Sequence, residues 1–312
     1  MICEQSDIHL IMESFNHTDQ YQINIETTED ILSRGVRTAL EDIIQRINNN
    51  SDMYDGVVGT HDSSAVFASI ICEHTGMPCI SVEGLVNCQN KYLSRRLQKN
   101  CVPEYAPHFC LDEEYLNHSE NMSPAFAKPS RSNVSFAAQK INTPEDLQQL
   151  IDEFGEDIKN YNQYFVESLS LSSYNNQENL DICNRFLCEE LIFGTQVTAY
   201  CYVYNKKSYV FALTKAAFFD DKISFSHHEF PYQVSPEMEQ KIHNMVNELA
   251  KGLKLDNTFI NVELRIDENT GEVYIIEVNG RIAFQFAKTI EVVKGFDPLH
   301  LICDLSAGGE PD

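Results

Sequence analysis

The spacing of hydrophobic residues in the first third of the chain predicts helices that alternate with short strands. Residues 5–16 read as one strand, whereas residues 28–50 repeat apolar side chains at intervals of mostly three or four, which is helix spacing. A second helix is predicted over 62–78, which begins with polar residues and ends at a glycine before a proline. Short apolar runs at 55–60 and 79–82 flank this helix and predict two strands. Strand, helix and strand in this order are typical of a βαβ unit with a parallel sheet.

The pattern further along the chain predicts strands connected by tight turns, together with amphipathic helices. Pro129 and the polar residues after it separate two apolar runs, and Asn205 marks a turn between two others. Pro144 and Ser235 stand at positions typical of helix starts. The predicted elements are a Lys- and Arg-rich helix over 87–103, strand–turn–strand over 123–141, a helix over 143–154, a long polar loop over 160–184, two or three strands over 186–219, a helix over 235–253 and a hairpin over 259–281.

The length of the chain and the order of these elements indicate an α/β protein with several parts. A chain of 312 residues is long enough for about two domains, or for one large domain with a substantial core. We predict an N-terminal βαβ domain over 1–85 and a small central part over 86–185, which includes the polar loop. A C-terminal part over 186–312 is predicted to carry the hairpin.

Charge and composition narrow the classes of partner. The formal net charge is −24, and such a surface repels nucleic-acid backbones and anionic membranes. Hydrophobic residues make up 43% of the chain, which argues against wholesale disorder. The ten cysteines form no CxxC pair and match no zinc spacing, so reduced core cysteines are favoured over a disulfide framework. The first fifteen residues resemble neither a secretory signal nor a membrane span, so we expect a soluble, cytoplasmic protein.

The final predicted hairpin brings together acidic and amide side chains that suit a metal ion. Residues two apart on a strand face the same side, so Glu277, Asn279 and Arg281 line one surface. The turn between the strands allows Glu263 to lie beside Glu277 on that side. Two close carboxylates repel each other unless a cation lies between them, and carboxylate and amide oxygens are ligands that Mg²⁺ prefers. The alternative is a solvated hairpin whose acids face water.

Two lysines earlier in the chain are candidates for binding phosphate. Lys91 lies in the basic helix, and Lys128 ends an apolar strand just before Pro129. A lysine that closes an apolar strand needs a charged partner or a route to water. Each lysine alone is best explained as a surface residue, but beside a metal and phosphate site both would offset phosphate charge.

The order of these pieces resembles the ATP-grasp superfamily over residues 55–312. The resemblance is carried by DGVVGTHD, NCQNKYLSRRLQKNCVP, AFAKPSRSNVSF, CEELIFGTQVTAY and NVELRIDENTGEVYIIEVNGRIA. The last block is the most specific, because an acid on one strand followed by Glu-x-Asn-x-Arg on the next is the superfamily's metal and phosphate signature. GMPCISVEGLVNCQNKYLSRR, SHHEFP and KGFDPLHLICDLSAGGEPD are most similar to carboxylate–amine ligases of the L-amino-acid ligase type. The resemblance implies an ATP-grasp fold behind a short N-terminal parallel βαβ domain.

The resemblance also implies roles for individual residues around ATP and Mg²⁺, with Mn²⁺ as an alternative ion. Glu263, Glu277 and Asn279 match the metal ligands, and Arg281 matches the residue that binds the acyl phosphate or the incoming carboxylate. The nucleotide matches are Lys91 and Lys128 at the phosphates, Glu189, Glu190 and Ile192 around adenine, and Gln196 at the ribose. Lys215 matches, less specifically, a position beside phosphate or substrate. His227 and His228 lie in the stretch over the substrate, where solvated histidines are favoured over catalytic ones.

Two positions depart from the superfamily pattern. The loop after Lys128 and Pro129 is normally rich in glycine, which lets backbone amides approach phosphates closely, but here SRSNVSF contains none. A ribose-binding Glu is replaced by Gln196, whose amide is a weaker hydrogen-bond partner than a charged acceptor. Either the loop has lost a tight clamp, or side chains cap the phosphates instead; the candidates are Ser130, Ser132, Asn133 and Ser135.

The function that the resemblance implies is an ATP- and Mg²⁺-dependent ligase. A carboxylate would attack the γ-phosphate to form an acyl phosphate, and an amine would then displace phosphate to form an amide. The expected partners are small carboxylates and amines, with no nucleic acid and no membrane, and the superfamily often forms homodimers. Two alternatives stay open: a nucleotide-binding or degenerate ATP-grasp protein without ligase turnover, and a ligase of another branch that uses a thiol or bicarbonate.

Overall fold

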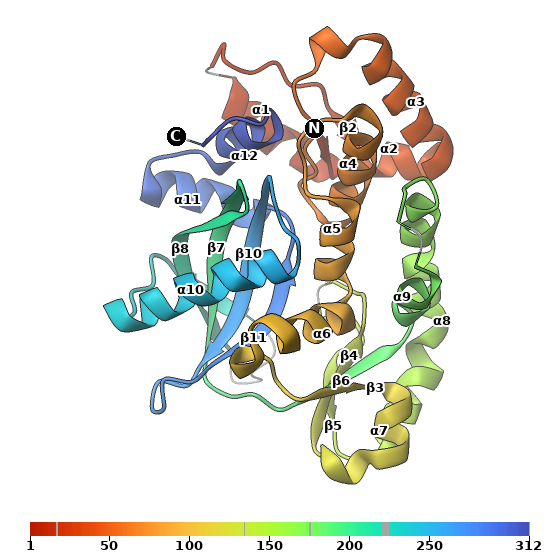
Figure 1. Ribbon diagram of the computed structural model, residues 1–312, viewed down its shortest axis with the longest axis vertical. Helices are drawn as coiled ribbons and strands as arrows, with labels where there is room; N and C mark the ends of the chain where they lie inside the picture. Colours follow the sequence, from red (N-terminus) through yellow and green to blue (C-terminus); the bar gives the residue numbers. More distant parts are fainter. Residues whose placement is uncertain (17, 134, 175, 220–224, 312) are drawn as a thin grey trace.

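Within the described residues, three β-sheets with two, four and five strands organise the chain, and helices join them (Figure 1). The computed structural model describes residues 1–16, 18–133, 135–174, 176–219 and 225–311. Helices combined with one parallel and two antiparallel sheets confirm the predicted α/β class. None of the described helices combines the length and the apolar character that a membrane crossing requires.

The N-terminal part is a minimal parallel sheet surrounded by helices. β1 (Ile2–Cys3) pairs in parallel with β2 (Glu26–Thr27), and Ile2 forms a parallel bridge with Gly59. A Cβ atom at Gly59 would lie 2.3 Å from the Ser64 carbonyl oxygen, so only glycine permits this close approach to α4 (Asp62–Thr75). The other helices of this part are α1 (Ile8–Phe15), α2 (Thr28–Ser33), α3 (Val36–Asn49), α5 (Val82–Gln89) and α6 (Lys91–Cys101).

The four-stranded sheet is antiparallel and has the order β3-β6-β4-β5. An apolar cluster that includes Tyr115, Leu147 and Phe186 packs two helices against it. Thr143 and Asp146 form a capping box around the start of the longer helix. The elements are β3 (Phe109–Leu111), α7 (Asp112–His118), β4 (Ala125–Pro129), β5 (Gln139–Ile141), α8 (Pro144–Leu169), α9 (Gln177–Ile182) and β6 (Phe186–Glu190).

The five-stranded sheet is also antiparallel and has the order β11-β10-β7-β8-β9. Asn205 and Lys206 have positive φ angles of 51° and 61° and form the tight turn between β7 and β8. Ser235 caps α10, which lies across one face of this sheet (Figure 1). The elements are β7 (Thr195–Tyr204), β8 (Lys207–Phe218), β9 (Phe225–Glu229), α10 (Pro236–Gly252), β10 (Thr258–Ile266) and β11 (Val273–Asn279).

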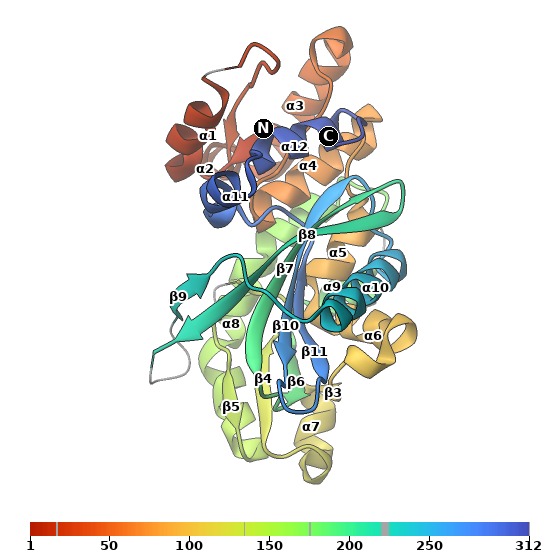
Figure 2. The ribbon, with the colours of Figure 1, turned by 90° about the vertical axis from the view of Figure 1, so that its left-hand side faces the viewer.

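The main apolar core joins the N-terminal helices to the five-stranded sheet. It contains Leu40 and Phe67 from α3 and α4, Leu249 from α10, and Val262 and Ile275 from β10 and β11. The four-stranded sheet lies next to the ends of β10 and β11 in both views (Figures 1 and 2). This arrangement brings β4 and β6 toward β11, where the candidate site lies.

The C-terminal helices close over the N-terminal end of the chain. α11 (Ala287–Lys294) and α12 (Pro298–Ser306) lie near α1, and the two termini are close together (Figures 1 and 2). A separate apolar cluster joins Ile11 and Phe15 of α1 to Ile302 and Leu305 of α12. The boundaries predicted after residues 85 and 185 stay predictions.

Three predicted strands near the N-terminus are wrong. Residues 5–16 contain helix α1, because Ile8, Ile11 and Phe15 recur at helix spacing, and the last two are buried. Residues 79–82 form no strand, since Ser81 caps α5 through the backbone N–H of Gly84. Residues 55–60 contribute only the bridge at Gly59.

The predicted polar loop over 160–184 is also wrong. α8 continues to Leu169 and buries Phe165 and Leu169, four positions apart, while α9 forms later in the same stretch. Asn175 lies outside the described residues. The predicted helix over 28–50 is two helices, because Gly35 adopts a φ angle of 80° between them.

Replacing Leu305 by alanine tests whether the C-terminal helices stabilise the chain. Leu305 is fully buried in the cluster shared with α1, so we expect Leu305→Ala to lower the free energy of unfolding by about 2–4 kcal/mol. Val292→Ala is the control, because Val292 lies exposed on α11 and its loss should cost less than about 0.5 kcal/mol. Urea denaturation measures both, and equal stabilities would contradict the packing described.

Candidate active site

The β10–β11 hairpin places two glutamates directly opposite each other. Glu263 of β10 pairs with Glu277 of β11, and Asn261 pairs with Asn279 in the same register. A β-bulge next to this pair inserts Ile276 into β11, which interrupts the regular alternation of the strand. The bulge leaves the two acids side by side and turns the Ile276 carbonyl group toward the four-stranded sheet, where it accepts hydrogen bonds described below.

The paired carboxylates form an electrostatic conflict that a cation would relieve. Burial, and then the nearby Glu277 carboxylate, raise the pKa of Glu263 to about 7. The Gln196 side chain donates a 3.2 Å hydrogen bond to Glu263 Oε2, and Lys91 Nζ lies 3.1 Å from Glu277 Oε1. A divalent cation between the carboxylates would stabilise the charged form of both acids.

Asn261 orients the third candidate ligand. Its Nδ2 donates to the Arg281 carbonyl oxygen at 3.2 Å, so its Oδ1 accepts the Nδ2 of Asn279 at 2.9 Å. This chain of hydrogen bonds leaves the Oδ1 of Asn279 as the atom that can face a cation. Among the described residues no three His, Cys, Asp or Glu side chains gather as a metal site, and this amide oxygen is the additional protein ligand that the hairpin offers beside its two carboxylates.

Lys91 links the hairpin to the loop after β4. Asn90 caps α6, so Lys91 begins the helix, and its side chain is buried. Its ammonium group contacts the Glu277 carboxylate and donates a 2.6 Å hydrogen bond to the Ser132 carbonyl oxygen. A single cation thus holds the candidate metal hairpin beside the loop that was predicted to cover phosphates.

Lys128 belongs to a buried charge cluster with Glu189, Arg95 and the bulge. Lys128 Nζ lies 2.7 Å from Glu189 Oε2, and the Arg95 guanidinium binds Glu189 Oε1. The Ile276 carbonyl oxygen accepts Arg95 Nη2 at 2.7 Å and Lys128 Nζ at 3.4 Å. The cluster therefore joins α6, β4 and β6 to β11.

Burial and ion pairing shift the pKa values in this cluster in opposite directions. Burial has the larger effect at Lys128, and the ion pairs together have the larger effect at Glu189. Burial lowers the pKa of Lys128 below its usual value, although the Glu189 carboxylate opposes this effect. Burial also opposes the charged form of Glu189, but the charges of Arg95 and Lys128 hold the pKa of Glu189 below its usual value. Glu189 is thus a carboxylate held between two cations.

Arg281 is held by an aspartate from the N-terminal part. Its Nε and Nη2 donate to the two oxygens of Asp62 at 2.7 and 3.2 Å, and its Nη1 donates to the Ile282 carbonyl oxygen at 3.1 Å. Burial opposes the charge on both side chains, yet their contact raises the pKa of Arg281 and lowers the pKa of Asp62. Of the five guanidinium N–H groups, three are used by these described contacts, and two remain to bind an anion.

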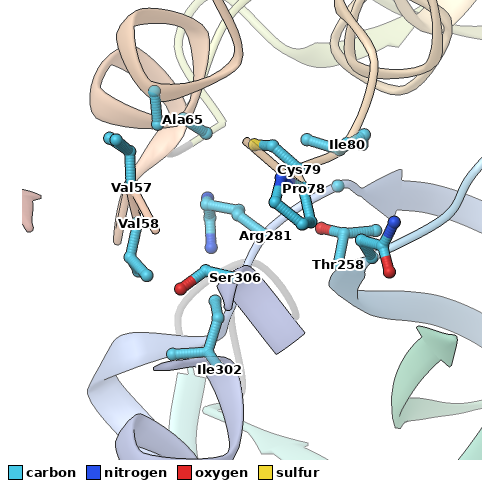
Figure 3. A pocket seen from close by; sticks show the side chains of 14 residues that line it. Val57, Val58, Ala65, Pro78, Cys79, Ile80, Thr258, Arg281, Ile302 and Ser306 are labelled. Atoms are coloured by element: carbon cyan, nitrogen blue, oxygen red, sulfur yellow. The ribbon is translucent and has the colours of Figure 1, made fainter. Parts of the chain in front are cut away.

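A small cavity lies beside Arg281, between the N-terminal part and α12. Figure 3 shows the Arg281 side chain extending toward Val57 and Val58, and Ser306 also lines the cavity. Its volume of about 30 Å³ corresponds to roughly one water molecule. This cavity is too small to hold a substrate.

The other predicted site residues lie around this set at different depths. The Glu190 carboxylate accepts the backbone N–H of His108, and Ile192 is half-buried in the linker between the two larger sheets. Lys215 pairs with Glu229 of β9 at 3.4 Å, and these described contacts do not join it to the hairpin acids. Ser135 is exposed, His227 is exposed, and the His228 ring packs against Phe286 with centroids 4.8 Å apart.

Four residues of this network were not singled out from the sequence. Arg95 follows Lys91 by four positions on the same helix, and Asn261 precedes Glu263 by two on the same strand, so both spacings carried a signal. Asp62 and Arg131, the latter at the start of the loop after β4, carried no such signal in the sequence. Their partners, Arg281 and Asn162, are distant along the chain.

Comparison with sequence families gives a match over the larger part of the chain. A family described as an ATP-grasp domain matches residues 122–289, which is more than half of the chain. No curated protein matches the sequence at a significant level.

Comparison with solved structures shows the same fold in several enzymes of low sequence identity. An L-amino acid ligase from Bacillus licheniformis superposes with a TM-score of 0.70 at 15% identity, over 98% of this chain and 73% of that chain. A phosphoribosylglycinamide synthetase from Anaerococcus prevotii gives 0.61 at 17% identity, over 99% and 75%. A D-alanine–D-alanine ligase from Bacillus anthracis gives 0.61 at 13% identity, over 98% and 96%.

Replacing Glu189 by glutamine tests the buried charge cluster. Glu189→Gln leaves two buried cations without their carboxylate, so we expect the free energy of unfolding at pH 7 to fall by about 3 kcal/mol or more. Glu190→Gln is the matched control, because the neighbouring carboxylate binds a backbone N–H near the surface and should cost about 1 kcal/mol. Chemical denaturation of both variants measures the difference.

The pH dependence of that difference provides a second check. The pKa of Glu189 in the folded protein lies below the ordinary value of 4.5, so its charge stabilises the fold above that pH. This contribution is lost as the pH falls through the folded-state pKa, and the gap between wild type and Glu189→Gln should narrow in acid. A gap that stays constant as the pH falls below 4.5 would show that the Glu189 charge does not stabilise the fold.

Proposed function

Because the chain belongs to the ATP-grasp domain family, we propose that it is an ATP- and Mg²⁺-dependent ligase that joins a carboxylate to an amine. The observation that carries the proposal is the pair of opposed glutamates, Glu263 and Glu277, flanked by an oriented amide and by two buried lysines. The similar structures from Bacillus licheniformis and Bacillus anthracis are also those of ligases.

The hairpin residues fit a hard divalent cation. Glu263, Glu277 and Asn279 supply carboxylate and amide oxygens on paired strands, which are ligands that a hard divalent cation prefers. Mg²⁺ or Mn²⁺ bound there would neutralise charge on the phosphates of ATP. Asn261 and Gln196 support this set by orienting Asn279 and Glu263.

The two lysines are proposed to exchange their present partners for phosphate oxygens. Lys91 contacts Glu277 and Lys128 contacts Glu189, so both ammonium groups lie beside the hairpin. Phosphates of ATP carry more charge than one carboxylate and would compete for both groups. The loop that contains Ser135 follows Lys128 and would lie over the same phosphates.

Arg281 is the proposed binding residue for the substrate carboxylate. Asp62 fixes its guanidinium plane and leaves two N–H groups for an anion. A carboxylate oxygen held there attacks the γ-phosphorus as the bond to the β-phosphate oxygen breaks, which releases ADP and forms an acyl phosphate. The amine nitrogen then bonds to the acyl carbon, and phosphate leaves with the former carboxylate oxygen. These steps ask the protein for positioning and charge stabilisation.

The remaining predicted residues are proposed to surround the rest of the nucleotide and the substrate. Glu189, Glu190 and Ile192 belong to the end of β6 and the linker after it, where adenine would bind between the two antiparallel sheets. Gln196, the second residue of β7, would lie near the ribose. Lys215, paired with Glu229, would approach the substrate from β8.

Release of ADP in the presence of Mg²⁺ and ATP tests the proposal. Single amino acids, small carboxylates and amines are offered alone and in pairs, and we expect release only with a carboxylate–amine pair. Glu277→Gln should reduce the rate by at least about 100-fold, the typical scale for losing one charge-stabilising group. Glu272→Gln, an exposed acid of the same hairpin, is the control and should keep the wild-type rate.

Two results would count against a ligase. Turnover that survives in Glu277→Gln would show that the metal assignment is wrong. Binding of nucleotide without ADP release for any pair would favour the alternative of a nucleotide-binding protein without ligase turnover, to which the glycine-free loop and Gln196 already point.

Replacing Asn261 by leucine tests how the metal ligands are oriented. Asn261→Leu frees the amide of Asn279 to rotate, so we expect Mn²⁺ affinity in the presence of the non-hydrolysable ATP analogue AMP-PNP to fall by about 10-fold or more. Electron paramagnetic resonance of free Mn²⁺ measures this affinity without turnover. Asn269→Ala in the exposed turn of the hairpin is the control. Equal Mn²⁺ affinities of the two variants would show that Asn261 does not orient the metal ligands.

A further inference from the structure

Arg131 is a buried guanidinium with neutral partners, four residues before the exposed Ser135. Only 2% of its surface is exposed. Among the described residues its hydrogen-bond acceptors are the side chains of Gln89, Asn162 and Tyr164, and none of them is a carboxylate. Burying a charge without a carboxylate in direct contact is costly, so this arrangement needs a specific explanation.

The surroundings of Arg131 are built for a planar guanidinium. Gln89 Oε1 accepts its Nε at 3.2 Å and its Nη2 at 3.0 Å, while Asn162 accepts Nη1 at 2.8 Å. The Tyr164 hydroxyl accepts Nη2 at 2.6 Å, and the Phe165 ring stacks at 3.9 Å from the guanidinium carbon. Four of five N–H groups are thereby satisfied, and lysine could not reproduce this fork.

The backbone around Arg131 is anchored on both sides by other elements. The Ser130 N–H donates to the Arg185 carbonyl oxygen at 2.8 Å, and the Ser130 carbonyl oxygen accepts the Lys91 N–H at 2.7 Å. The Ser132 carbonyl oxygen accepts Lys91 Nζ at 2.6 Å. The Arg131 side chain lies between α5 and α8. The start of this glycine-free loop is therefore held by contacts to α6, to the segment before β6, to α5 and to α8.

A continuous path of hydrogen bonds leads from Arg131 to Arg281. Gln89 accepts two N–H groups of Arg131 and donates its own Nε2 to the Asp62 carbonyl oxygen at 2.7 Å. The Asp62 carboxylate in turn binds Arg281 through both oxygens. The loop after β4 and the proposed carboxylate-binding residue are therefore set by one network.

We propose that Arg131 is a positioning residue, which holds the glycine-free loop over the nucleotide phosphates and, through Gln89 and Asp62, aligns that loop with Arg281. This inference rests on the proposed function. In place of the flexible backbone of a glycine-rich loop, a buried side chain fixes where the loop begins. The loop that follows would approach the phosphates with residues 132–133 and 135–138, among which Ser135 and Ala137 adopt positive φ angles of 57° and 51°.

Calorimetric binding of two probes to the full chain tests the inference. Mg-AMP-PNP contacts the phosphate region, whereas adenosine contacts only the base and ribose region. We expect Arg131→Lys to weaken Mg-AMP-PNP binding by about 10-fold or more and adenosine binding by less than about 2-fold. Arg37→Lys is the matched control, because it makes the same chemical change at a half-exposed arginine that binds Glu41 and Ser170.

Gln89→Met provides a second variant that keeps the Arg131 contacts to Asn162, Tyr164 and Phe165. It should also weaken Mg-AMP-PNP binding more than adenosine binding, and hydrogen–deuterium exchange should rise in residues 130–138 of both variants. If Arg131→Lys does not fold, Gln89→Met decides the question. A purely structural role would leave the ratio of the two affinities unchanged in the folded variants, and that result overturns the inference.

The two proposals fail in distinguishable ways. Wild-type protein that binds neither probe would show that the nucleotide site is wrong, and the inference about Arg131 would fall with it. Wild-type protein that binds both probes, together with variants that keep the wild-type affinity ratio, would leave the nucleotide site intact and remove only the role of Arg131.

Discussion

The contact of Glu189 with two buried cations is the interaction on which the arrangement of the site depends. Arg95 comes from α6, Lys128 from β4 and Glu189 from β6, and the carbonyl group of the β11 bulge completes the cluster. Each ion is buried, so removing Glu189 would leave two cations without a counter-charge in a region of low dielectric constant. These ion pairs, together with apolar packing, hold the four-stranded sheet beside the β10–β11 hairpin.

Around that cluster, several polar side chains act on their neighbours without facing the reacting groups. Asn261 fixes the orientation of Asn279, and Asp62 fixes the plane of Arg281. Such partners remove the freedom of the side chains they hold, which is how a site keeps its geometry before substrates arrive. In the proposal made above, Arg131 has the same effect on a loop, because its buried side chain holds the start of the glycine-free loop in place.

The sequence predicted the hairpin and the family better than it predicted the N-terminal part. Alternation along β10 and β11 was enough to place Glu263 opposite Glu277, because the turn sets the register of a hairpin. The strand predicted over 5–16 failed since Ile8, Ile11 and Phe15 fit a helix as well as a short apolar run fits a strand. The polar loop predicted over 160–184 failed because Asn162 and Ser168 are buried by tertiary contacts that composition does not reveal.

Long-range partners of the candidate site were beyond the reach of sequence patterns. Lys91 was singled out in a basic helix and Lys128 at the end of an apolar strand, but their counter-ions, Glu277 and Glu189, come from strands that lie far along the chain. Arg95 had a local signal, four positions from Lys91, whereas Asp62 and Gln89 had none, since they act through Arg281 and Arg131. Pairing that depends on how sheets are brought together becomes visible only in the folded chain.

A crystal structure of the protein with Mn²⁺ and AMP-PNP would test the central claim most directly. The account predicts an anomalous Mn²⁺ peak between Glu263 and Glu277, with metal–oxygen distances of about 2.0–2.3 Å to both acids and to the Oδ1 of Asn279. It also predicts that the ammonium groups of Lys91 and Lys128 bind phosphate oxygens. A nucleotide bound elsewhere, or a phosphate group without metal at this hairpin, would contradict the account.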